Sequence, residues 1–104
     1  MIARHWKGLA KPGEAENYVN HLRTETFPKL SEINGFIEAS ILRREVDRGT
    51  EFLILTIWES MEAIERFAGA TADVAVVPVV AQAMMIEYDG NVSHYEIIES
   101  YKPV

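Results

Sequence analysis

The stretch "TIWESMEAIERFAG", residues 56–69, contains the junction on which the fold depends. A β-rich run ends at Trp58, and Ser60 follows two residues later, where its oxygen can accept a hydrogen bond from the first turn of a helix. Apolar residues then recur at helical spacing up to Gly69, a residue type that commonly ends helices. The stretch therefore predicts a strand that passes directly into an amphipathic helix. Trp58 either plugs the core beneath that helix or forms a wall of a pocket between strand and helix.

The residues before this junction predict a β-hairpin. Residues 36–46 and 51–58 are rich in β-branched and aromatic side chains, and the glycine-containing loop "DRGT" separates them. Residues 53–58, "LILTIW", are apolar at nearly every position. Because successive side chains of a strand point to opposite faces, this pattern indicates that both faces of the strand are covered.

The two ends of the chain add a strand and a helix on one side and a strand on the other. Residues 2–8, "IARHWKG", alternate in character and predict a strand that Gly8 closes. From residue 14 the apolar positions follow helical spacing, and we predict a helix that Pro28 ends or kinks near residue 27. The alternative is a further turn over residues 29–33, "KLSEI", which Asn34-Gly35 would stop. Residues 92–100, "VSHYEIIES", predict the last strand.

Residues 70–86 are rich in alanine and valine, with Pro78 in the middle, and their pattern is ambiguous. We predict a short helix, a break near the proline and a second apolar piece. The longest apolar stretch, residues 74–86, is too short to span the ~30 Å of a membrane's hydrocarbon core. The N-terminus also lacks the apolar region of a signal peptide. We therefore expect a cytoplasmic protein with no membrane partner.

The element order β-α-β-β-α-β is that of a ferredoxin-like α+β fold, a four-stranded antiparallel sheet with both helices on one face. We predict one such domain over residues 1–104. Its other face would be bare, although residues 53–58 are apolar on both faces. Self-association through the open sheet face covers these side chains, so the sequence predicts a homodimer.

Charge and composition exclude two classes of function. The net charge is −6, and the ten Lys and Arg residues are scattered, whereas a nucleic-acid site needs a clustered basic face. The chain contains no cysteine, so disulfides and thiol chemistry are excluded. We therefore expect no nucleic-acid partner.

Three segments resemble the antibiotic biosynthesis monooxygenase family within the dimeric α/β barrel superfamily. They are "ARHWKG" at 3–8, "LILTIWESMEAIERFAG" at 53–69 and "SHYEIIES" at 93–100. The resemblance implies two ferredoxin-like protomers packed sheet to sheet into a barrel, each with a pocket between its sheet and its helices. Related barrels host cofactor-free oxygenation of quinol-like aromatics, haem degradation, isomerisation and decarboxylation, so the site residues must be weighed one at a time.

The resemblance argues against haem degradation. The haem-degrading branch uses a histidine, a tryptophan and an asparagine, and matching along the "TIWES" segment places Val77, Phe67 and Trp6 (or His5) at or near these positions. Many close relatives also carry a tyrosine pair and acidic residues where this chain has "VVPVVA", residues 76–81. These departures predict that haem is not a substrate and that the pocket is more apolar.

Histidine is the side chain best suited to acid–base chemistry near neutral pH, since its ordinary pKa is about 6.5. His94 and His5 lie on the last and first predicted strands, which are neighbours in this fold. His94 is the stronger candidate for a base that deprotonates a phenol, because it lies in the resembling "HYE" segment. The alternative is that each simply forms hydrogen bonds in the core or at the dimer contact. We expect His21, on the flank of the first helix, at the surface.

Arg4 and Trp6 share one face of the first strand, opposite to His5. An arginine could hold a carboxylate or phenolate, and an indole could stack on an aromatic ring. The alternative is that Arg4 pairs with Glu96 on the last strand and that Trp6 only packs. The remaining candidates for substrate contact, each with a structural alternative, are Tyr18, Trp58, Phe67 and Tyr95.

The sequence shows no metal-ligand spacing, no glycine-rich phosphate loop and no GxSxG motif. We therefore predict a cofactor-independent monooxygenase acting on a small aromatic or quinol-like substrate. His94, Arg4 and His5 would be its catalytic groups. The alternatives are a non-catalytic dimeric barrel that binds a hydrophobic small molecule, and an isomerase or cyclase of the same superfamily.

Overall fold

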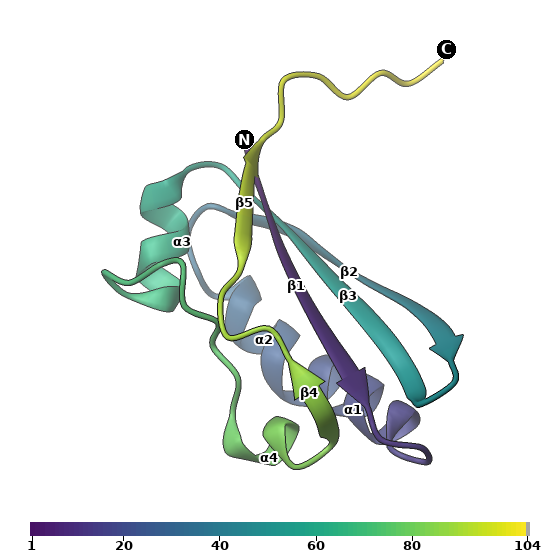
Figure 1. The fold of residues 1–104 in the computed structure, drawn as a ribbon. Helices are drawn as coiled ribbons and strands as arrows, with labels where there is room; N and C mark the ends of the chain where they lie inside the picture. Colours follow the sequence, from purple (N-terminus) through teal and green to yellow (C-terminus); the bar gives the residue numbers. More distant parts are fainter. Residues whose placement is uncertain (104) are drawn as a thin grey trace.

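The computed structural model describes residues 1–103 and contains one antiparallel sheet with its helices on one face (Figure 1). The strand order is β2-β3-β1-β4, and β5 also pairs with β1. This arrangement confirms the predicted α+β, ferredoxin-like class. The strands are β1 (Ile2–Ala10), β2 (Phe36–Val46), β3 (Gly49–Trp58), β4 (Met85–Tyr88) and β5 (Ser93–Glu96). The helices are α1 (Ala15–His21), the π-helix η1 (Leu22–Thr26), α2 (Phe27–Ser31), α3 (Met61–Ala68) and α4 (Val79–Gln82).

The first strand was predicted to end at Gly8, but it continues to Ala10. Gly8 lies inside the strand because of close packing rather than a turn. A Cβ atom there would lie 2.5 Å from Cη2 of Trp6 and 3.0 Å from Sδ of Met85. The glycine therefore makes room for the Trp6 indole to lie along its own strand.

The hairpin loop is shorter than predicted, because β3 begins at Gly49 and only Asp47 and Arg48 separate it from β2. A Cβ atom at Gly49 would lie 2.1 Å from the carbonyl oxygen of Ala10, so the start of β3 needs glycine for its approach to β1. The predicted junction after β3 is confirmed. The hydroxyl of Ser60 accepts from the N–H of Ala63 at 3.2 Å, which caps α3.

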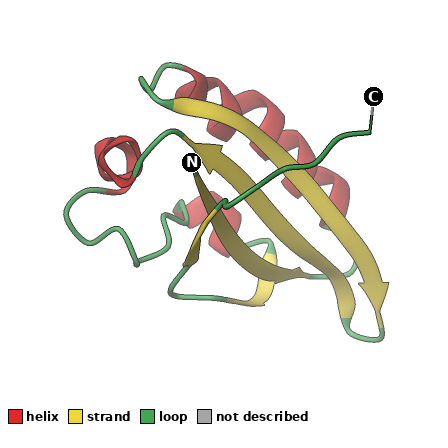
Figure 2. Ribbon diagram, turned by 90° about the horizontal axis from the view of Figure 1, so that it is seen from above, coloured by secondary structure: helices red, strands yellow, loops and turns green. Residues whose placement is uncertain are grey.

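The first helical segment does not end near residue 27 but continues to Ser31 through the π-helical turn η1, in agreement with the alternative of a further turn after Pro28. Figure 2 shows this long helix running alongside the strands. Pro28 lies in the first turn of α2, where its missing N–H is tolerated. The N–H of Phe27 bonds to the carbonyl of Leu22, five residues earlier. The proline therefore coincides with a widened turn instead of a helix end.

Residues 70–86 differ from the prediction, because no helix precedes Pro78 and the short α4 follows it. The residue before a proline is disfavoured in the α conformation, whereas the proline itself fits just before a helix, as it does here. Of the predicted last strand, 92–100, only β5 forms, and a strand that was not predicted, β4, lies beside the other half of β1. β4 pairs with Gly8–Ala10 and β5 with Ile2–His5, so the two short strands share one edge of β1.

Two clusters of buried residues form the core beneath the helices. The first joins α1 and η1 to β1, β3, α4 and β4, and the second joins α2 and α3 to Trp58, the last residue of β3. Trp58 belongs to the second cluster and is 0% exposed. It stacks on Phe67 at 5.8 Å between ring centroids and meets the edge of Phe36 at 5.3 Å. Trp58 thus fills the core beneath α3.

The other face of the sheet is uncovered by any helix of residues 1–103 (Figure 1). Along β3 the residues of the helix-covered face are buried, whereas Leu53, Leu55 and Ile57 on the open face are only partly buried. Leu42, paired with Leu53 across the β2–β3 ladder, is 44% exposed. The third strand is therefore apolar on both faces, as predicted, but only one of them is covered within the protomer.

Candidate functional site

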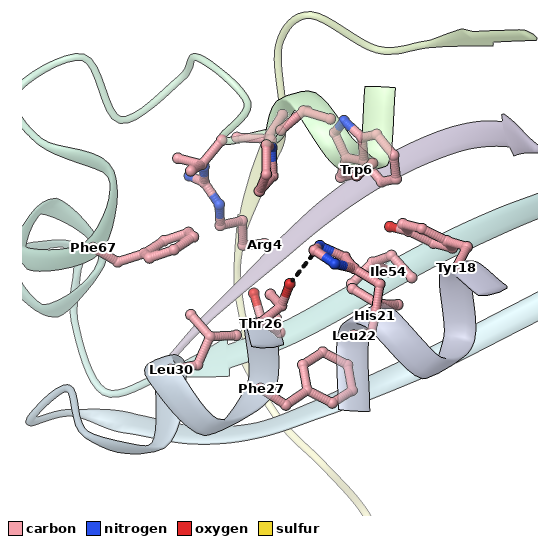
Figure 3. A pocket seen from close by; sticks show the side chains of 16 residues that line it. Arg4, Trp6, Tyr18, His21, Leu22, Thr26, Phe27, Leu30, Ile54 and Phe67 are labelled. Atoms are coloured by element: carbon pink, nitrogen blue, oxygen red, sulfur yellow. Dashed lines mark hydrogen bonds between the residues drawn. The ribbon is translucent and has the colours of Figure 1, made fainter. Parts of the chain in front are cut away.

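A cavity of about 80 Å³ lies between the two core clusters, enclosed by β1, β3, the first helical segment and the loop before α4. Figure 3 shows the side chains that line it. Its walls are mostly apolar. The lining residues are Arg4, Trp6, Tyr18, His21, Leu22, Thr26, Phe27, Leu30, Ile54, Thr56, Phe67, Val76, Val77, Pro78, Ala81 and Val92.

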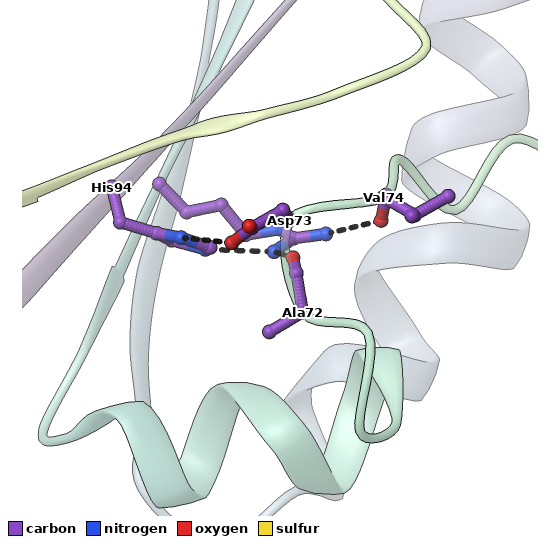
Figure 4. Close-up of polar contacts among 5 residues, drawn as sticks. Ala72, Asp73, Val74 and His94 are labelled. Carbon is purple, nitrogen blue, oxygen red and sulfur yellow. Dashed lines mark hydrogen bonds and ion pairs between the residues drawn. The ribbon is translucent and has the colours of Figure 1, made fainter.

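Arg4 is the cation of this cavity and is only 5% exposed. Its Nη1 donates to the carbonyl of Ala72 at 2.6 Å and lies 2.8 Å from Nε2 of His94, while Nη2 donates to the carbonyl of Val74 at 3.3 Å (Figure 4). No carboxylate of residues 1–103 lies within ion-pair distance of it. Burial lowers the pKa of Arg4, and the charge of the more distant Asp73 opposes that shift.

These contacts use three of the five N–H groups of the guanidinium, and each goes to a neutral acceptor. A buried charge normally has a partner of opposite sign. The alternative that Arg4 pairs with Glu96 is wrong, because Glu96 lies opposite Ile2 in the β1–β5 ladder and His94 lies opposite Arg4. The site is therefore a buried cation suited to an anionic ligand.

His94 is partly buried and does not line the cavity. To accept from Arg4 its Nε2 must be unprotonated, so the imidazole is neutral and its proton lies on Nδ1. Nδ1 in turn lies 4.0 Å from a carboxylate oxygen of Asp73 (Figure 4). Burial first and the charge of Arg4 second lower the pKa of His94, and Asp73 opposes them. His94 is thus a neutral acceptor that helps to hold Arg4.

The structure does not bring His5 and Tyr95 to the cavity. Strand alternation places both on the open face of the sheet, where their rings meet at 5.0 Å between centroids. Tyr95 is paired with Ala3, the neighbour of Arg4 on β1, so both point to the side of the sheet opposite to Arg4. The candidate base His5 and the candidate contact Tyr95 therefore lie on the opposite face from Arg4.

The other aromatic candidates divide into two groups. Trp6, Tyr18 and Phe67 line the cavity, and the guanidinium carbon of Arg4 lies 5.7 Å from the centre of the Phe67 ring. Burial raises the pKa of the Tyr18 hydroxyl, which therefore stays protonated as a hydrogen-bond donor. Trp58 lies outside the lining, behind Phe67, and its Nε1–H donates to the hydroxyl of a cavity residue, Thr56, at 2.9 Å.

Three polar residues of the cavity were not predicted from the sequence: His21, Thr26 and Thr56. His21 in particular was expected at the surface, which is wrong. It follows Tyr18 by three residues, and this helical spacing was a signal that the two share a face. Thr56 lies directly opposite Arg4 in the β1–β3 ladder. Its only signal was a polar residue within an apolar strand.

Within residues 1–103, no group of three or more histidine, aspartate and glutamate side chains is arranged to hold a metal ion. Among the helices of the described part of the chain, none has the length and apolar character needed to cross a membrane.

Comparison with known proteins places this geometry in context. The sequence profile described as antibiotic biosynthesis monooxygenase matches residues 1–75. A search of curated proteins gives no match.

Among solved structures, a candidate antibiotic biosynthesis monooxygenase from Bacillus cereus is 22% identical, with a TM-score of 0.71 over 100% of this chain and 97% of that one. SnoaB, a cofactor-independent oxygenase from Streptomyces nogalater, is 17% identical, with a TM-score of 0.61 over 95% of this chain and 94% of that one. A variant of MhuD with two manganese protoporphyrin IX molecules per active site is 16% identical, with a TM-score of 0.63 over 99% of this chain and 100% of that one. At these identities the similarity shows a shared fold.

Proposed function

The chain belongs to the antibiotic biosynthesis monooxygenase family, and on that premise we propose that it is a cofactor-independent oxygenase of a small aromatic or quinol-like substrate. The observation that carries the proposal is Arg4, a buried guanidinium held by neutral acceptors at the side of an apolar cavity. An anionic substrate supplies the negative charge that the protomer does not place there. The apolar walls favour an aromatic body for the same substrate.

The reaction begins when the substrate loses a phenolic proton. The phenolate is electron-rich and reduces O₂ directly, so that one oxygen atom enters the substrate and the other leaves as water. Where the phenol is the enol form of a ring ketone with a conjugated CH₂ group, that CH₂ carbon becomes a carbonyl in this way, and its two hydrogen atoms, one of them the phenolic proton, leave with the water. Because the substrate itself supplies the electrons, the reaction needs no added reductant.

The cavity residues contribute position and charge to this reaction. Arg4 stabilises the phenolate by a charge-assisted hydrogen bond. Trp6 and Phe67 offer ring faces and edges against which an aromatic substrate packs. Tyr18 offers a neutral hydroxyl. Apolar residues of the loop before α4, such as Val77, keep water away from the reacting ring.

The size of the cavity limits the substrate. Pockets for drug-sized ligands measure ~300–1,000 Å³, whereas this one measures about 80 Å³. A molecule of about one ring, with any further part extending from the cavity mouth, fits this volume best. We also propose that the protein acts as a homodimer, because the open sheet face leaves apolar side chains such as Leu42 and Leu53 uncovered.

Oxygen uptake tests the proposal. Purified protein is mixed with a panel of single-ring and two-ring quinols in air, and O₂ consumption is followed with an electrode beside product analysis. We expect uptake with at least one quinol and a loss of about 10–100-fold in kcat/KM for Arg4→Gln, because hydrogen bonds to charged groups contribute about 1.5–3 kcal/mol. Arg43→Gln is the matched control, since Arg43 pairs with Glu16 on the surface.

Three results would count against an oxygenase. No uptake across the panel, or an unchanged rate for Arg4→Gln, contradicts the proposal directly. Product that forms equally well without O₂ favours an isomerase or cyclase. Quenching of Trp6 fluorescence by a quinol without turnover favours a non-catalytic binding protein, and Trp58 is replaced by Phe in that experiment so that Trp6 alone reports.

A further inference from the structure

The π-helical turn η1 brings together two side chains that an α-helix would separate. His21 and Thr26 are five residues apart, and their Nε2 and Oγ1 atoms lie 3.4 Å from each other. In an α-helix of 3.6 residues per turn, such residues point about 140° apart around the axis. Over Leu22–Thr26 the hydrogen bonding shifts to five residues, as the N–H of Phe27 bonds to the carbonyl of Leu22. That wider turn places His21 and Thr26 on one side of the helix.

The side of the helix that carries His21 and Thr26 faces the cavity. Both residues line it, and in Figure 3 the imidazole and the hydroxyl project from the helix toward the strand that carries Arg4 and Trp6. The ionisable residues of the cavity lining are Arg4, Tyr18 and His21. Arg4 cannot accept a proton, and Tyr18 is held protonated by burial. His21 is the remaining ionisable residue of the lining, and an imidazole nitrogen can accept a proton.

Thr26 also differs from a neighbouring threonine in the same turn. The hydroxyl of Thr24 bonds to the carbonyl of Asn20, four residues earlier, which is the usual arrangement for threonine in a helix. The hydroxyl of Thr26 instead contacts the His21 ring. When His21 Nε2 carries its proton and donates to Thr26, the lone pair on Nδ1 is free.

We propose that His21 is the proton acceptor of the cavity, that Thr26 is its positioning residue, and that the ligand is a phenol or enol whose O–H meets His21. The inference rests on the proposed oxygenase function. The O–H bond of the ligand breaks, its proton moves to the imidazole, and the electron pair stays on the oxygen. The positive charges of Arg4 and of the new imidazolium stabilise the anion. In the oxygenation, the same proton leaves with the water formed from O₂.

Kinetics of paired variants test the assignment. His21→Gln should lower kcat by about 10²–10⁴-fold, the usual contribution of a general base, and should abolish the rise in rate with pH that deprotonation of the base produces. Thr26→Val should lower kcat by up to about 10²-fold with little change in KM, because the ring loses its orientation. Thr24→Val is the matched control, since Thr24 lies in the same turn but outside the cavity lining.

A second measurement is independent of oxygenation. Under anaerobic conditions the protein is saturated with 4-nitrophenol at a pH about one unit below the solution pKa of that phenol, and the phenolate absorbance is recorded. The wild-type protein should show more phenolate than free solution, and His21→Gln should lose most of this excess. Circular dichroism confirms that the variants are folded.

The two measurements separate the two proposals. If no quinol is oxidised but the excess phenolate depends on His21, the oxygenase function fails and the proton acceptor stands. If quinols are oxidised and His21→Gln keeps the wild-type rate and pH profile, the oxygenase stands and His21 is excluded. Phenolate absorbance that is absent in wild type, or equal in wild type and His21→Gln, also overturns the assignment of His21.

Discussion

Arg4 and His94 face each other across the β1–β5 ladder, with Nη1 of Arg4 2.8 Å from Nε2 of His94. The guanidinium of Arg4 lines the cavity, whereas the imidazole of His94, on β5, lies outside the lining. The lone pair that His94 would need as a base is directed at Arg4. The geometry thus supports His94 as the group that positions Arg4, whereas the sequence had suggested it as the base.

His94→Ala distinguishes these two roles. We expect a higher KM with kcat changed by less than about 10-fold, since Arg4 keeps its charge but loses an acceptor. The free energy of unfolding should fall by about 1–3 kcal/mol, because a buried donor is left without its partner. Steady-state kinetics and urea unfolding are measured on the same preparation. A loss of about 10²–10⁴-fold in kcat with unchanged stability would instead make His94 the base.

His94 should also make the fold sensitive to acid. Its pKa in the folded protein is below the ordinary value of 6.5, so the unfolded chain binds the proton more readily. The contribution of His94 to stability is therefore complete above about pH 6.5 and is lost as the pH falls through its lowered pKa in the folded protein. Thermal unfolding between about pH 7.5 and about pH 5 should show a smaller drop in Tm for His94→Gln than for wild type. Equal drops would exclude His94 as the source.

Trp58 and Trp6 should respond differently to truncation. Trp58 is fully buried in the second core cluster, so Trp58→Ala should cost about 3–5 kcal/mol of stability. Trp6 lines the cavity, so Trp6→Ala should weaken ligand binding more than it lowers stability. Urea unfolding and a ligand titration are compared for both variants. The opposite ranking would make Trp58 a wall of the binding site.

The open sheet face should mediate a homodimer. Sedimentation at micromolar concentration should give about twice the chain mass of 11.8 kDa. Leu53→Glu should weaken association by about 10²-fold or more, because it would bury an unpaired charge at the contact. Val79→Glu is the control, since Val79 is 79% exposed on α4, on the helical side. A wild-type monomer under these conditions would contradict the proposed dimer.

Haem should not be a substrate. Val77 and Phe67, which the resemblance along "TIWES" matches to the histidine and tryptophan of the haem-degrading branch, both line the cavity and offer no metal ligand. Titration with haem should give no stoichiometric shift of the Soret band. The MhuD variant that shares the fold binds two porphyrins per active site and provides the positive control. Tight binding followed by ring cleavage under a reductant would show that the prediction is wrong.

The sequence by itself determined the elements whose signals are local. The apolar, β-branched run of β3, the Ser60 cap and the glycine stop at Gly69, with φ of 79°, each act over a few residues. These signals specify the strand-to-helix junction without knowledge of any distant contact. The apolar residues on both faces of β3 likewise indicated that both faces are covered, and the helices of the described chain cover one of them.

Only the tertiary structure decided how the cavity is built. The bond from Arg4 to Ala72 joins residues 68 positions apart, and that to His94 joins residues 90 apart. Which carbonyl meets the guanidinium depends on the path of the loop after α3, for which the sequence carries no periodic pattern. The contact of His21 with Thr26 depends on the π-turn, and its place in the cavity wall depends on how the helix packs over the sheet. Packing between segments that are distant in the sequence decides these contacts. The free energy that favours them arises only when those segments come together and bury their apolar surfaces.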